Sequence, residues 1–552
     1  MAVQIPEEQS SVQSPVSTAP TVSLEQVVER LTQGIVLRNE GRLTEALAVM
    51  DEVIHLAPSL TPPRVHRAHL LADLGRYEEA LLECNALLET GGPIFENLWL
   101  RDDLRERGLA ATEARLAEYP EDAEALQRRG DLHFITGQFD EAEQAYAEAL
   151  AVHPDHHGTL EGHGHALLAL DRREEALAAY RQLLLLPHGE ARHWVNFGNV
   201  LQSLGALEEA EEAYRQAILR EPELPEAHLE LGHCRLAAGD FDQGWRQYQW
   251  RWRTRQMGHL ALDTPQPRWP DQSGGELTGK TILLWAEQGL GDTLQFARYA
   301  RQVADQVGTA GKVVLRAPAP LKELLASLDP RVEVVAEQTP LPPHDCHSPL
   351  MSLPLALDQG APAALAAYLQ ANEDRRRAWA QRLGETRRLR VGLAWAGKPR
   401  FPSNSSRDIP LQVLLPLAGL DVDWVSLQRD EPAGDAEARA HFLDLQRHEL
   451  AWVDFAETAA LMDNLDLVIS VDTAMAHLAG ALGKPCWVLL RQAGEWRWQR
   501  DRNDSPWYPS LTLFRQTQQG DWEPVVEAVL AALTAMAAAH QENSKDSAAT
   551  PV

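Results

Sequence analysis

Two aspartates are the residues of this chain best suited to chemistry. Each lies between a predicted strand and the predicted helix that follows it. Asp472 follows the apolar, β-branched run Leu467–Val471, and Asp292 follows the apolar run Thr281–Ala286 and a glycine-rich turn. Ligands of parallel sheets bind where strands end and helices begin, so both carboxylates are expected to face a crevice. A carboxylate in that position can act as a general base. The alternative is that each aspartate only caps the helix that follows it.

The turn after Asp472 suits the binding of a phosphate. The backbone N–H groups of Thr473, Ala474 and Met475 open a predicted helix, and a helix N-terminus attracts anions through its free N–H groups and its dipole. His477 lies one turn further along, on the same face as Thr473. These residues therefore indicate an anion site. The alternative is that His477 is a core histidine whose hydrogen bonds are satisfied.

A basic loop stands out in an acidic chain. The whole chain has a formal net charge of −29, yet residues 387–407 contain six basic residues and no acidic residue. Lys398, Arg400 and Arg407 in this stretch could hold a pyrophosphate, because guanidinium and ammonium groups form charge-assisted hydrogen bonds with phosphate oxygens. The alternative is a solvated basic loop without a ligand.

Two sheets are needed to position these residues, and short apolar runs rich in β-branched residues predict them. The expected strands are Thr281–Ala286, Lys312–Leu315 and Val332–Val335 in the first sheet and Arg390–Trp395, Trp424–Leu427, Leu467–Val471 and Cys486–Leu490 in the second. The order strand, turn, helix, strand is typical of parallel sheets. The loop at residues 493–508 carries Trp496, Trp498 and Trp507. These rings either cover a bound base or sugar or pack against a neighbouring lobe.

A repeat of thirty-four residues occupies the N-terminal half. It keeps small residues and tyrosines in register at Gly130, Gly164, Gly198 and Gly232, at Ala142, Ala176 and Ala210, and at Tyr146, Tyr180, Tyr214 and Tyr248. Small residues allow two helices to pack closely. The pattern resembles the tetratricopeptide repeat, whose helical hairpins stack into a superhelix with a concave binding face. Ala46 and Ala80 mark two looser units, and residues 89–122 hold a degenerate one. The repeats predict a protein partner.

Composition excludes several classes of function. The net charge of −29 argues against a nucleic-acid partner. The four cysteines are scattered, which fits a reducing compartment and a cytoplasmic protein. No apolar run approaches about 18 residues, so no membrane span is expected. The D-x-D triplet at Asp421 and Asp423 precedes a predicted strand instead of following one, so we assign no metal and no cofactor.

The two strand–turn–helix segments resemble a known family. QGLGDTLQF at 288–296 and DLVISVDTAMAHLAGALGKP at 466–485 are similar to the two motifs of the ADP-heptose:lipopolysaccharide heptosyltransferases, glycosyltransferase family 9. The resemblance covers residues 280–530. With the repeat array in front, the chain resembles a bacterial group of tetratricopeptide glycosyltransferases. It also has the layout of the O-linked N-acetylglucosamine transferases.

This resemblance implies a fold, a reaction and a set of site residues. The fold is GT-B, with two Rossmann-like lobes, and the reaction is a metal-independent, inverting transfer. Asp292 falls on the acid proposed as the base, and Lys398 resembles the lysine that meets the donor phosphate. With the cations of the basic loop, the residues predicted to bind the nucleotide sugar are Gly291, Lys398, Arg400, Arg407, Asp472, Thr473, Ala474, Met475 and His477. Ala474 stands where the family often has glycine.

The predicted fold class is α plus α/β, with a tetratricopeptide α-solenoid before the GT-B domain. We expect a disordered tail at 1–22, repeats at 23–256, a linker at 257–279, the N-terminal lobe at 280–385, the C-terminal lobe at 386–540 and a disordered tail at 541–552. The predicted function is transfer of a sugar from a nucleotide-diphosphate sugar to a protein recruited by the repeats. The alternatives are a non-catalytic scaffold with a degenerate transferase domain and a glycan or lipid glycosyltransferase whose repeats only assemble a complex.

Overall fold

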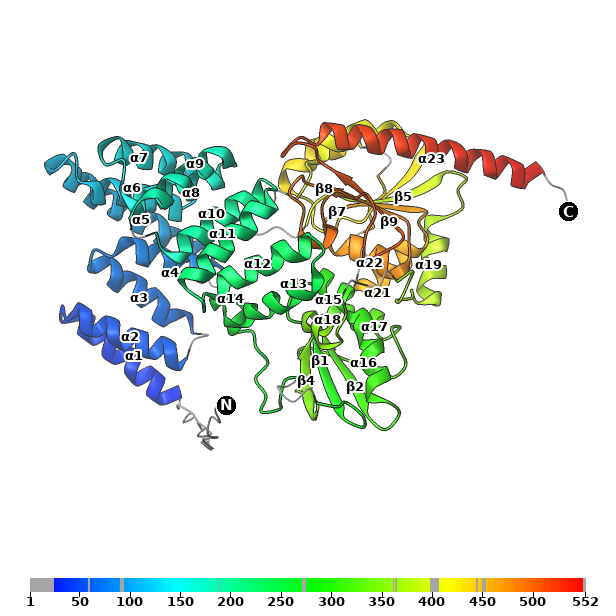
Figure 1. The fold of residues 1–552 in the computed structure, drawn as a ribbon, viewed down its shortest axis with the longest axis horizontal. Coiled ribbons are helices and arrows are strands. Elements are labelled where there is room, and N and C mark those ends of the chain that lie inside the picture. The colour runs from blue at the N-terminus through cyan, green and yellow to red at the C-terminus, as the bar shows by residue number, and fades with distance from the viewer. Residues whose placement is uncertain are drawn as a thin grey trace, which may run out of the picture. The chain divides into compact units, whose positions relative to one another are not determined.

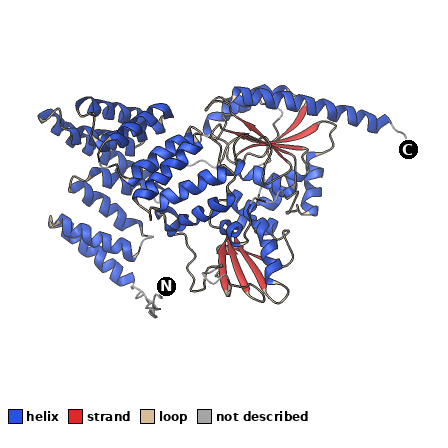
Figure 2. Ribbon diagram, in the orientation of Figure 1, coloured by secondary structure: helices blue, strands red, loops and turns tan. Residues whose placement is uncertain are grey.

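The chain divides into two compact units, residues 1–172 and 173–552, and each is described separately. A computed structural model describes residues 24–57, 60–89, 94–187, 189–270, 275–360, 362, 365–397, 407–442, 445–448 and 453–549 (Figure 1). Unit 1 is helical, and the described strands all lie in the second unit, after its own repeat helices (Figure 2). The predicted fold class, α plus α/β, is confirmed.

The described part of unit 1 consists of three helical pairs, the long helix α5 and the helix α8. The described helices are α1 (Leu24–Asn39), α2 (Leu43–Leu56), α3 (Thr61–Asp73), α4 (Tyr77–Glu89), α5 (Ile94–Glu118), α6 (Ala123–Ile135), α7 (Phe139–Val152) and α8 (His157–Ala169). The single helix α5 occupies the stretch in which the sequence register slips. A degenerate repeat was predicted there, and one long helix replaces the hairpin.

The glycine–tyrosine spacing of the repeats has a steric cause. A Cβ atom added at Gly130 would lie 2.5 Å from the ring of Tyr146 in unit 1, and one added at Gly198 would lie 2.5 Å from the ring of Tyr214 in unit 2. Only glycine leaves room for the tyrosine of the second helix of the hairpin. Both tyrosines are buried. The thirty-four-residue period therefore records a repeated packing contact.

The last repeats belong to unit 2. Their described helices are α9 (Arg173–Leu185), α10 (Ala191–Ser203), α11 (Leu207–Arg220), α12 (Pro225–Ala237), α13 (Phe241–Tyr248), the 3₁₀ helix η1 (Gln249–Arg253) and α14 (Arg255–Gly258). The predicted boundary between repeats and linker at residue 256 therefore falls inside a compact unit.

The N-terminal lobe is built on a four-stranded parallel sheet in the order β3-β2-β1-β4. Its elements are β1 (Thr281–Trp285), α15 (Leu290–Phe296), η2 (Ala297–Tyr299), α16 (Ala300–Val307), β2 (Lys312–Ala317), α17 (Lys322–Leu325), β3 (Val332–Ala336), β4 (Cys346–Pro349) and α18 (Leu353–Ala356), and α19 (Glu373–Leu383) follows. Three strands were predicted, and β4 was missed. Its sequence, CHSP, has no β-branched residue and ends in proline, so local pattern gives no strand signal.

The C-terminal lobe is built on a five-stranded parallel sheet in the order β6-β5-β7-β8-β9. Its elements are β5 (Leu389–Ala394), η5 (Leu411–Gly419), β6 (Val422–Ser426), α20 (Ala436–His441), α21 (Phe455–Asp463), β7 (Leu467–Val471), α22 (Ala474–Leu482), β8 (Cys486–Leu490), η8 (Trp496–Trp498), β9 (Leu511–Arg515) and α23 (Glu523–Ala549). The four predicted strands are confirmed, and β9 was not predicted. Asp423 lies inside β6, so the expectation that it precedes the strand was wrong.

The long C-terminal helix α23 packs on this lobe. By length and composition, residues 523–542 are the one described stretch able to cross a membrane, and this is weak evidence of a span. Val525, Val529 and Leu533 recur at helical spacing and are buried in the core of the lobe. The helix continues to Ala549, past residue 541, where a disordered tail was predicted.

Buried aromatic and ionic contacts join the last repeat to both lobes. The ring of Trp245 lies edge-on to Phe296, at 5.8 Å, and to Trp496, at 5.4 Å between centroids. Beside them, Arg251 donates to Glu287 at 2.9 Å, and both side chains are at most 1% exposed. Residue 287 directly precedes the turn into α15, so this ion pair fixes the end of strand β1 against the repeats.

Replacing Arg251 with methionine should destabilise unit 2 strongly. The change leaves the Glu287 carboxylate buried without its cation, which costs about 3–5 kcal/mol of unfolding free energy. The matched control is Arg253→Met, two residues along, because Arg253 pairs with Glu223 on the surface with side chains 58% and 76% exposed. That change should cost about 0–1 kcal/mol. Denaturant titration of the full chain, followed by tryptophan fluorescence, measures both; equal losses would contradict the role given to the buried pair.

Candidate functional site

The two predicted strand–turn–helix segments face each other across the lobes. Strand β1 leads into α15, and strand β7 leads into α22. A Cβ atom added at Gly291, in the first turn of α15, would lie 2.9 Å from Cδ2 of His477 and 3.5 Å from Cα of Ala474. The N-terminal turns of the two helices are therefore in contact, and glycine at residue 291 makes that contact possible. The carboxyl ends of two parallel sheets meet here, where ligands of such sheets bind.

Asp292 both caps its helix and joins an ion pair. Its Oδ2 accepts a hydrogen bond from the backbone N–H of Gly289 at 2.9 Å, which satisfies one of the open donors at the start of α15. Its Oδ1 accepts a hydrogen bond from Nη2 of Arg497 at 2.5 Å. The side chain is 23% exposed. The capping alternative therefore describes one oxygen of Asp292, and the other oxygen faces a cation.

Arg497 is the centre of the charge network at this place. The guanidinium is buried, donates to Glu495 and donates to Oε1 of Gln295 at 2.8 Å. It also lies over the ring of Trp496, 4.2 Å from the centroid. Since Asp292 and Gln295 belong to α15 while Glu495 and Trp496 belong to the segment after β8, this one side chain bridges the two lobes.

The turn after β7 is capped by Thr473 and not by Asp472. The Thr473 hydroxyl accepts from the backbone N–H of Met475 at 3.3 Å and lies 3.1 Å from the hydroxyl of Ser470. Asp472 stands at the end of the strand. Burial raises the pKa of its carboxyl, and the Trp498 indole together with the guanidinium groups of Arg497 and Arg407 opposes that shift. The capping alternative for Asp472 is therefore wrong, and its carboxyl interacts with cations from two segments.

His477 has the surroundings of a packed core residue. Its side chain is 5% exposed, its ring stacks on Trp498 at 5.3 Å, and its Nδ1 lies 3.1 Å from the hydroxyl of Tyr508. Burial, and then the positive charges of Arg497 and Arg298, holds the pKa of His477 well below its ordinary value. The ring is therefore neutral near pH 7 and offers a ligand no positive charge.

One of the three predicted basic-loop cations is described. Arg407 is exposed and approaches the end of β5, because a Cβ atom added at Gly397 would lie 2.8 Å from its Nη2. The carboxylate of the neighbouring Asp408 accepts a hydrogen bond from the backbone N–H of Gly397 at 2.8 Å. This bond connects residue 397, just after β5, to residue 408. Lys398 and Arg400 lie outside the described residues.

Sequence reasoning missed three charged residues of the site, Arg491, Glu495 and Arg497. Arg491 is the first residue after strand β8, so the strand-end rule that selected the two aspartates could have selected it as well. Burial lowers the pKa of Arg491, as does the nearby Arg173, while Asp472 and Glu495 raise it. In this loop the sequence pattern points only to the tryptophans, as possible cover for a base or sugar. Trp496, Trp498 and Trp507 are buried, and they pack against a neighbouring lobe or within the core, as one of the two alternatives had it.

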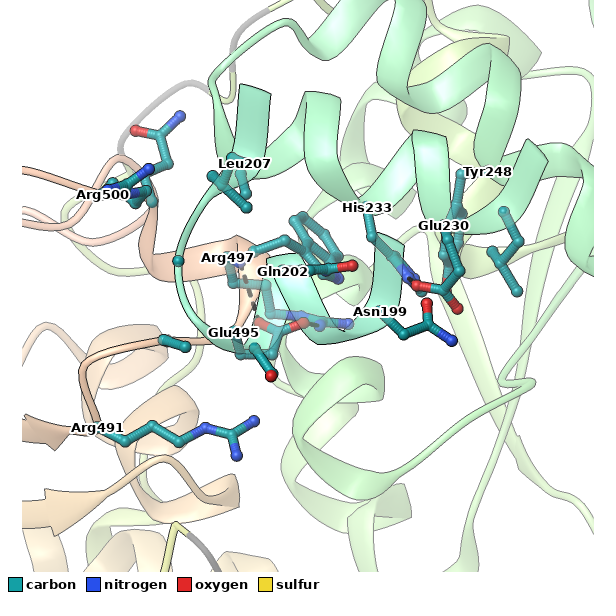
Figure 3. A pocket seen from close by; sticks show the side chains of 18 of the residues that line it. Asn199, Gln202, Leu207, Glu230, His233, Tyr248, Arg491, Glu495, Arg497 and Arg500 are labelled. Atoms are coloured by element: carbon teal, nitrogen blue, oxygen red, sulfur yellow. Dashed lines mark hydrogen bonds and ion pairs between the residues drawn. The ribbon is translucent and has the colours of Figure 1, made fainter. Parts of the chain in front are cut away.

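A cavity of about 780 Å³ lies between the last repeats and the C-terminal lobe. Asn199, Gln202, Glu230 and His233 come from the repeat helices, and Arg491, Glu495, Arg497 and Arg500 come from the segment after β8 (Figure 3). Gln288, next to the turn that Asp292 caps, also lines it. Within the described part of the chain, no group of three or more His, Cys, Asp or Glu side chains could hold a metal ion.

Comparison with known proteins finds family matches in the N-terminal and the C-terminal regions of the chain. Residues 428–520 match glycosyltransferase family 9 (heptosyltransferase). Tetratricopeptide repeats match at residues 123–156, 161–218 and 195–244. The chain therefore carries tetratricopeptide repeats in its N-terminal region and a glycosyltransferase family 9 domain at its C-terminal end, as the motifs predicted.

Individual relatives cover only parts of the chain. Protein FlbA of Caulobacter vibrioides is 29% identical over 354 residues, and the match covers 58% of this chain and 57% of FlbA. The chain thus spans a little over half the length of that relative. Among solved structures, MamA from Desulfovibrio magneticus is 18% identical over 31% of this chain and 92% of its own, with a TM-score of 0.26. A tetratricopeptide protein from Thermus thermophilus is 17% identical over 38% and 99%, with a TM-score of 0.23.

The charge network predicts a pH dependence of stability that Glu495 controls. Burial raises the pKa of Glu495 to about 7, with Asp472 and Asp292 adding to the rise and Arg497 opposing it. The folded protein then holds this proton at pH values where the unfolded chain, with a glutamate pKa of about 4.3, has lost it. Stability from this group therefore falls as pH rises from about 4.5 to about 7.

Glu495→Gln cannot titrate and should lose this part of the pH dependence. The unfolding free energy of the wild type minus that of the variant should fall steadily over that pH window. Glu527→Gln, on the exposed side of α23, is the control and should give a flat difference. Denaturant titrations at several pH values measure both, and a flat difference for Glu495→Gln as well would contradict the assignment.

Proposed function

We propose that the protein is a glycosyltransferase that moves a sugar from a nucleotide-diphosphate sugar to a protein acceptor recruited by its repeats. The reaction is metal-independent and inverting. The family 9 match at residues 428–520 supports the reaction class. The observation that carries the proposal is the contact between the first turns of α15 and α22, because it brings an acid from one lobe beside the predicted anion site of the other.

The donor's diphosphate is proposed to bind at the start of α22. The N–H groups of Thr473 and Ala474 and the dipole of a nine-residue helix favour a negative charge there. Met475 would add its N–H where the phosphate replaces the Thr473 hydroxyl as its acceptor. Arg407 supports this assignment, because its charge acts on Asp472 at the end of the same strand. Lys398 and Arg400 complete the proposed set on sequence grounds. Gly291, Ala474 and His477 contribute shape, since they form the contact between the helices and the histidine is neutral.

Asp292 is the proposed base. In an inverting transfer it takes the proton of the acceptor while the acceptor atom bonds to the sugar carbon and the bond from that carbon to the diphosphate oxygen breaks. The oxygen of the diphosphate leaves with the electron pair, so positive charge near it lowers the barrier. Asp292 already accepts two hydrogen bonds, but a carboxylate has about four lone-pair sites and can accept further ones.

The repeats are proposed to recruit the acceptor, since stacked helical hairpins usually bind peptides or proteins. A cytoplasmic location is part of the proposal, and it rests on four cysteines that are free and buried. Two other functions remain as outcomes of the experiments below. One is a scaffold whose transferase domain is inactive, and the other is a transferase acting on a glycan or lipid.

Calorimetric titration with a panel of ADP-, UDP-, GDP- and dTDP-sugars tests donor binding. We expect one nucleotide class to bind without added metal, because the proposed site neutralises the diphosphate with protein cations and helix N–H groups. Chelation of divalent ions should leave the affinity unchanged. Failure of every donor to bind would favour the scaffold function.

The roles of the two lobes can be separated by two substitutions. Asp292→Asn should lower turnover by about 10²–10⁴-fold and leave donor affinity nearly unchanged. Asn keeps one oxygen for the N–H of Gly289 and loses the oxygen that accepts from Arg497. Asn caps a helix about as well as Asp, and Glu495 still balances the charge of Arg497, so the fold should survive. Arg407→Ala should weaken donor binding as well as turnover. Donor titration and turnover on the acceptor measure both, and wild-type turnover of a folded Asp292→Asn protein would rule out Asp292 as the base.

A further inference from the structure

The cavity between the last repeats and the segment after β8 is rich in carboxamide side chains. Six of its described lining residues are asparagine or glutamine: Asn199, Gln202, Gln256, Gln288, Gln492 and Gln499. Each carboxamide offers both a hydrogen-bond donor and an acceptor. A peptide group offers the same pair in return, so walls of this kind match an extended backbone whatever its side chains are.

Two of these carboxamides are held in place by one tyrosine. The hydroxyl of Tyr214 lies 2.8 Å from Oδ1 of Asn199 and 2.8 Å from Oε1 of Gln202. A hydroxyl has a single hydrogen, so the Tyr214 hydroxyl shares it between the two carboxamide oxygens, and the NH₂ groups of Asn199 and Gln202 stay available as donors. Tyr214 is buried and is one of the repeat tyrosines. The same contact that spaces the helices therefore orients these side chains on the cavity wall, which lowers the entropy cost of binding.

The charges of the cavity favour an acidic segment. Five of its described lining residues are arginines, against the two carboxylates of Glu230 and Glu495: Arg173, Arg251, Arg491, Arg497 and Arg500. Arg173 and Arg491 lie close enough that the charge of one lowers the pKa of the other. The arginine side chains of this wall repel one another, and an anion between them would offset that repulsion. The chain as a whole has a net charge of −29, so such a positive wall is unusual in it.

The same walls do not suit a nucleotide. The phenol of Tyr248 and the indole of Trp496 are 2% and 7% exposed, so no described lining residue offers an open indole or phenol face on which a base or sugar could stack. The volume of about 780 Å³ lies within the usual range for a specific pocket. It can hold a short stretch of extended chain.

The cavity reaches the proposed catalytic acid. Arg497 is one of its lining residues and donates to Oδ1 of Asp292 at 2.5 Å. Gln288 lines it as well, directly before the Gly289 N–H group that caps Asp292, and its Nε2 donates to the hydroxyl of Tyr248 at 2.7 Å. A segment bound here lies one side chain away from the proposed base.

We propose that this cavity is the acceptor site and that it binds an extended, acidic polypeptide segment mainly through its backbone. This inference rests on the proposed function and assigns the acceptor class and its place. The repeats then contribute to the active site directly, through Asn199, Gln202 and Arg173, and do not act only as a distant tether.

Peptide binding to the full chain tests the proposal without any donor. An array of capped peptides of varied sequence is probed with the wild-type protein, and the strongest binders are remade with shuffled sequences and with every second peptide nitrogen methylated. Shuffled peptides of equal charge should bind about equally well. The N-methylated forms should bind about tenfold more weakly or worse, because they lose backbone N–H donors, each worth about 0.5–1.5 kcal/mol.

Substitutions in the cavity wall provide a second test of the proposal. The double variant Asn199→Leu with Gln202→Leu should weaken peptide binding by about tenfold or more. The matched control is Gln216→Leu on the neighbouring helix α11, whose carboxamide pairs with Glu212 and does not line the cavity. It should bind peptides as the wild type does. Melting temperatures check that all three proteins are folded.

The outcomes separate this inference from the function on which it rests. No peptide binding by the wild type, full binding of N-methylated peptides, or an unchanged affinity of the double variant would each overturn the acceptor site. Donor binding is measured independently by calorimetry on the same proteins. Loss of the acceptor site with donor binding intact leaves the transferase function standing. Peptide binding without any donor binding overturns the transferase function and leaves a peptide-binding cavity that is not an acceptor site.

Discussion

The position of one short segment, residues 287–292, depends on two buried guanidinium groups from different parts of the chain. Arg251, from the end of the repeats, donates to Glu287 at one end, and Arg497, from the C-terminal lobe, donates to Asp292 at the other. Removing a charge from water costs several kcal/mol, and only a well-placed counter-charge offsets it. The turn between β1 and α15 is therefore fixed by the repeats and by the second lobe together.

This constraint explains why the proposed catalytic role and the packing roles coincide in the same residues. Asp292 is a cap, an ion-pair partner and the proposed base, while Gly291 allows α15 to touch α22. His477 fills the space between that contact and Trp498 as a neutral ring. An acid that must accept a proton at a defined place benefits from such support, because small displacements of a catalytic group are costly.

Sequence patterns predicted what depends on local periodicity and missed what depends on distant partners. The glycine–tyrosine repeat and seven strands follow from short-range patterns, and the strand-end rule located Asp292 and Asp472. Strand β4 has no such pattern, because CHSP forms a strand only by pairing with β1. Arg497 was missed for the same reason: the two partners that connect it to the other lobe, Asp292 and Gln295, lie about 200 residues away in sequence. Thr473 took the capping role expected of Asp472 because its hydroxyl reaches the N–H of Met475.

The end of the repeat pattern and the boundary between the compact units fall at different residues. The repeat pattern ends near residue 256, yet the chain separates into compact units after residue 172. A division at 256 would remove Trp245 from Phe296 and Trp496 and leave Glu287 buried without its cation. The last hairpins are therefore part of the core on which the proposed active site stands. Because they share that core, the proposed acceptor recognition by these hairpins and the proposed chemistry at Asp292 would be coupled through buried packing contacts and not through a linker.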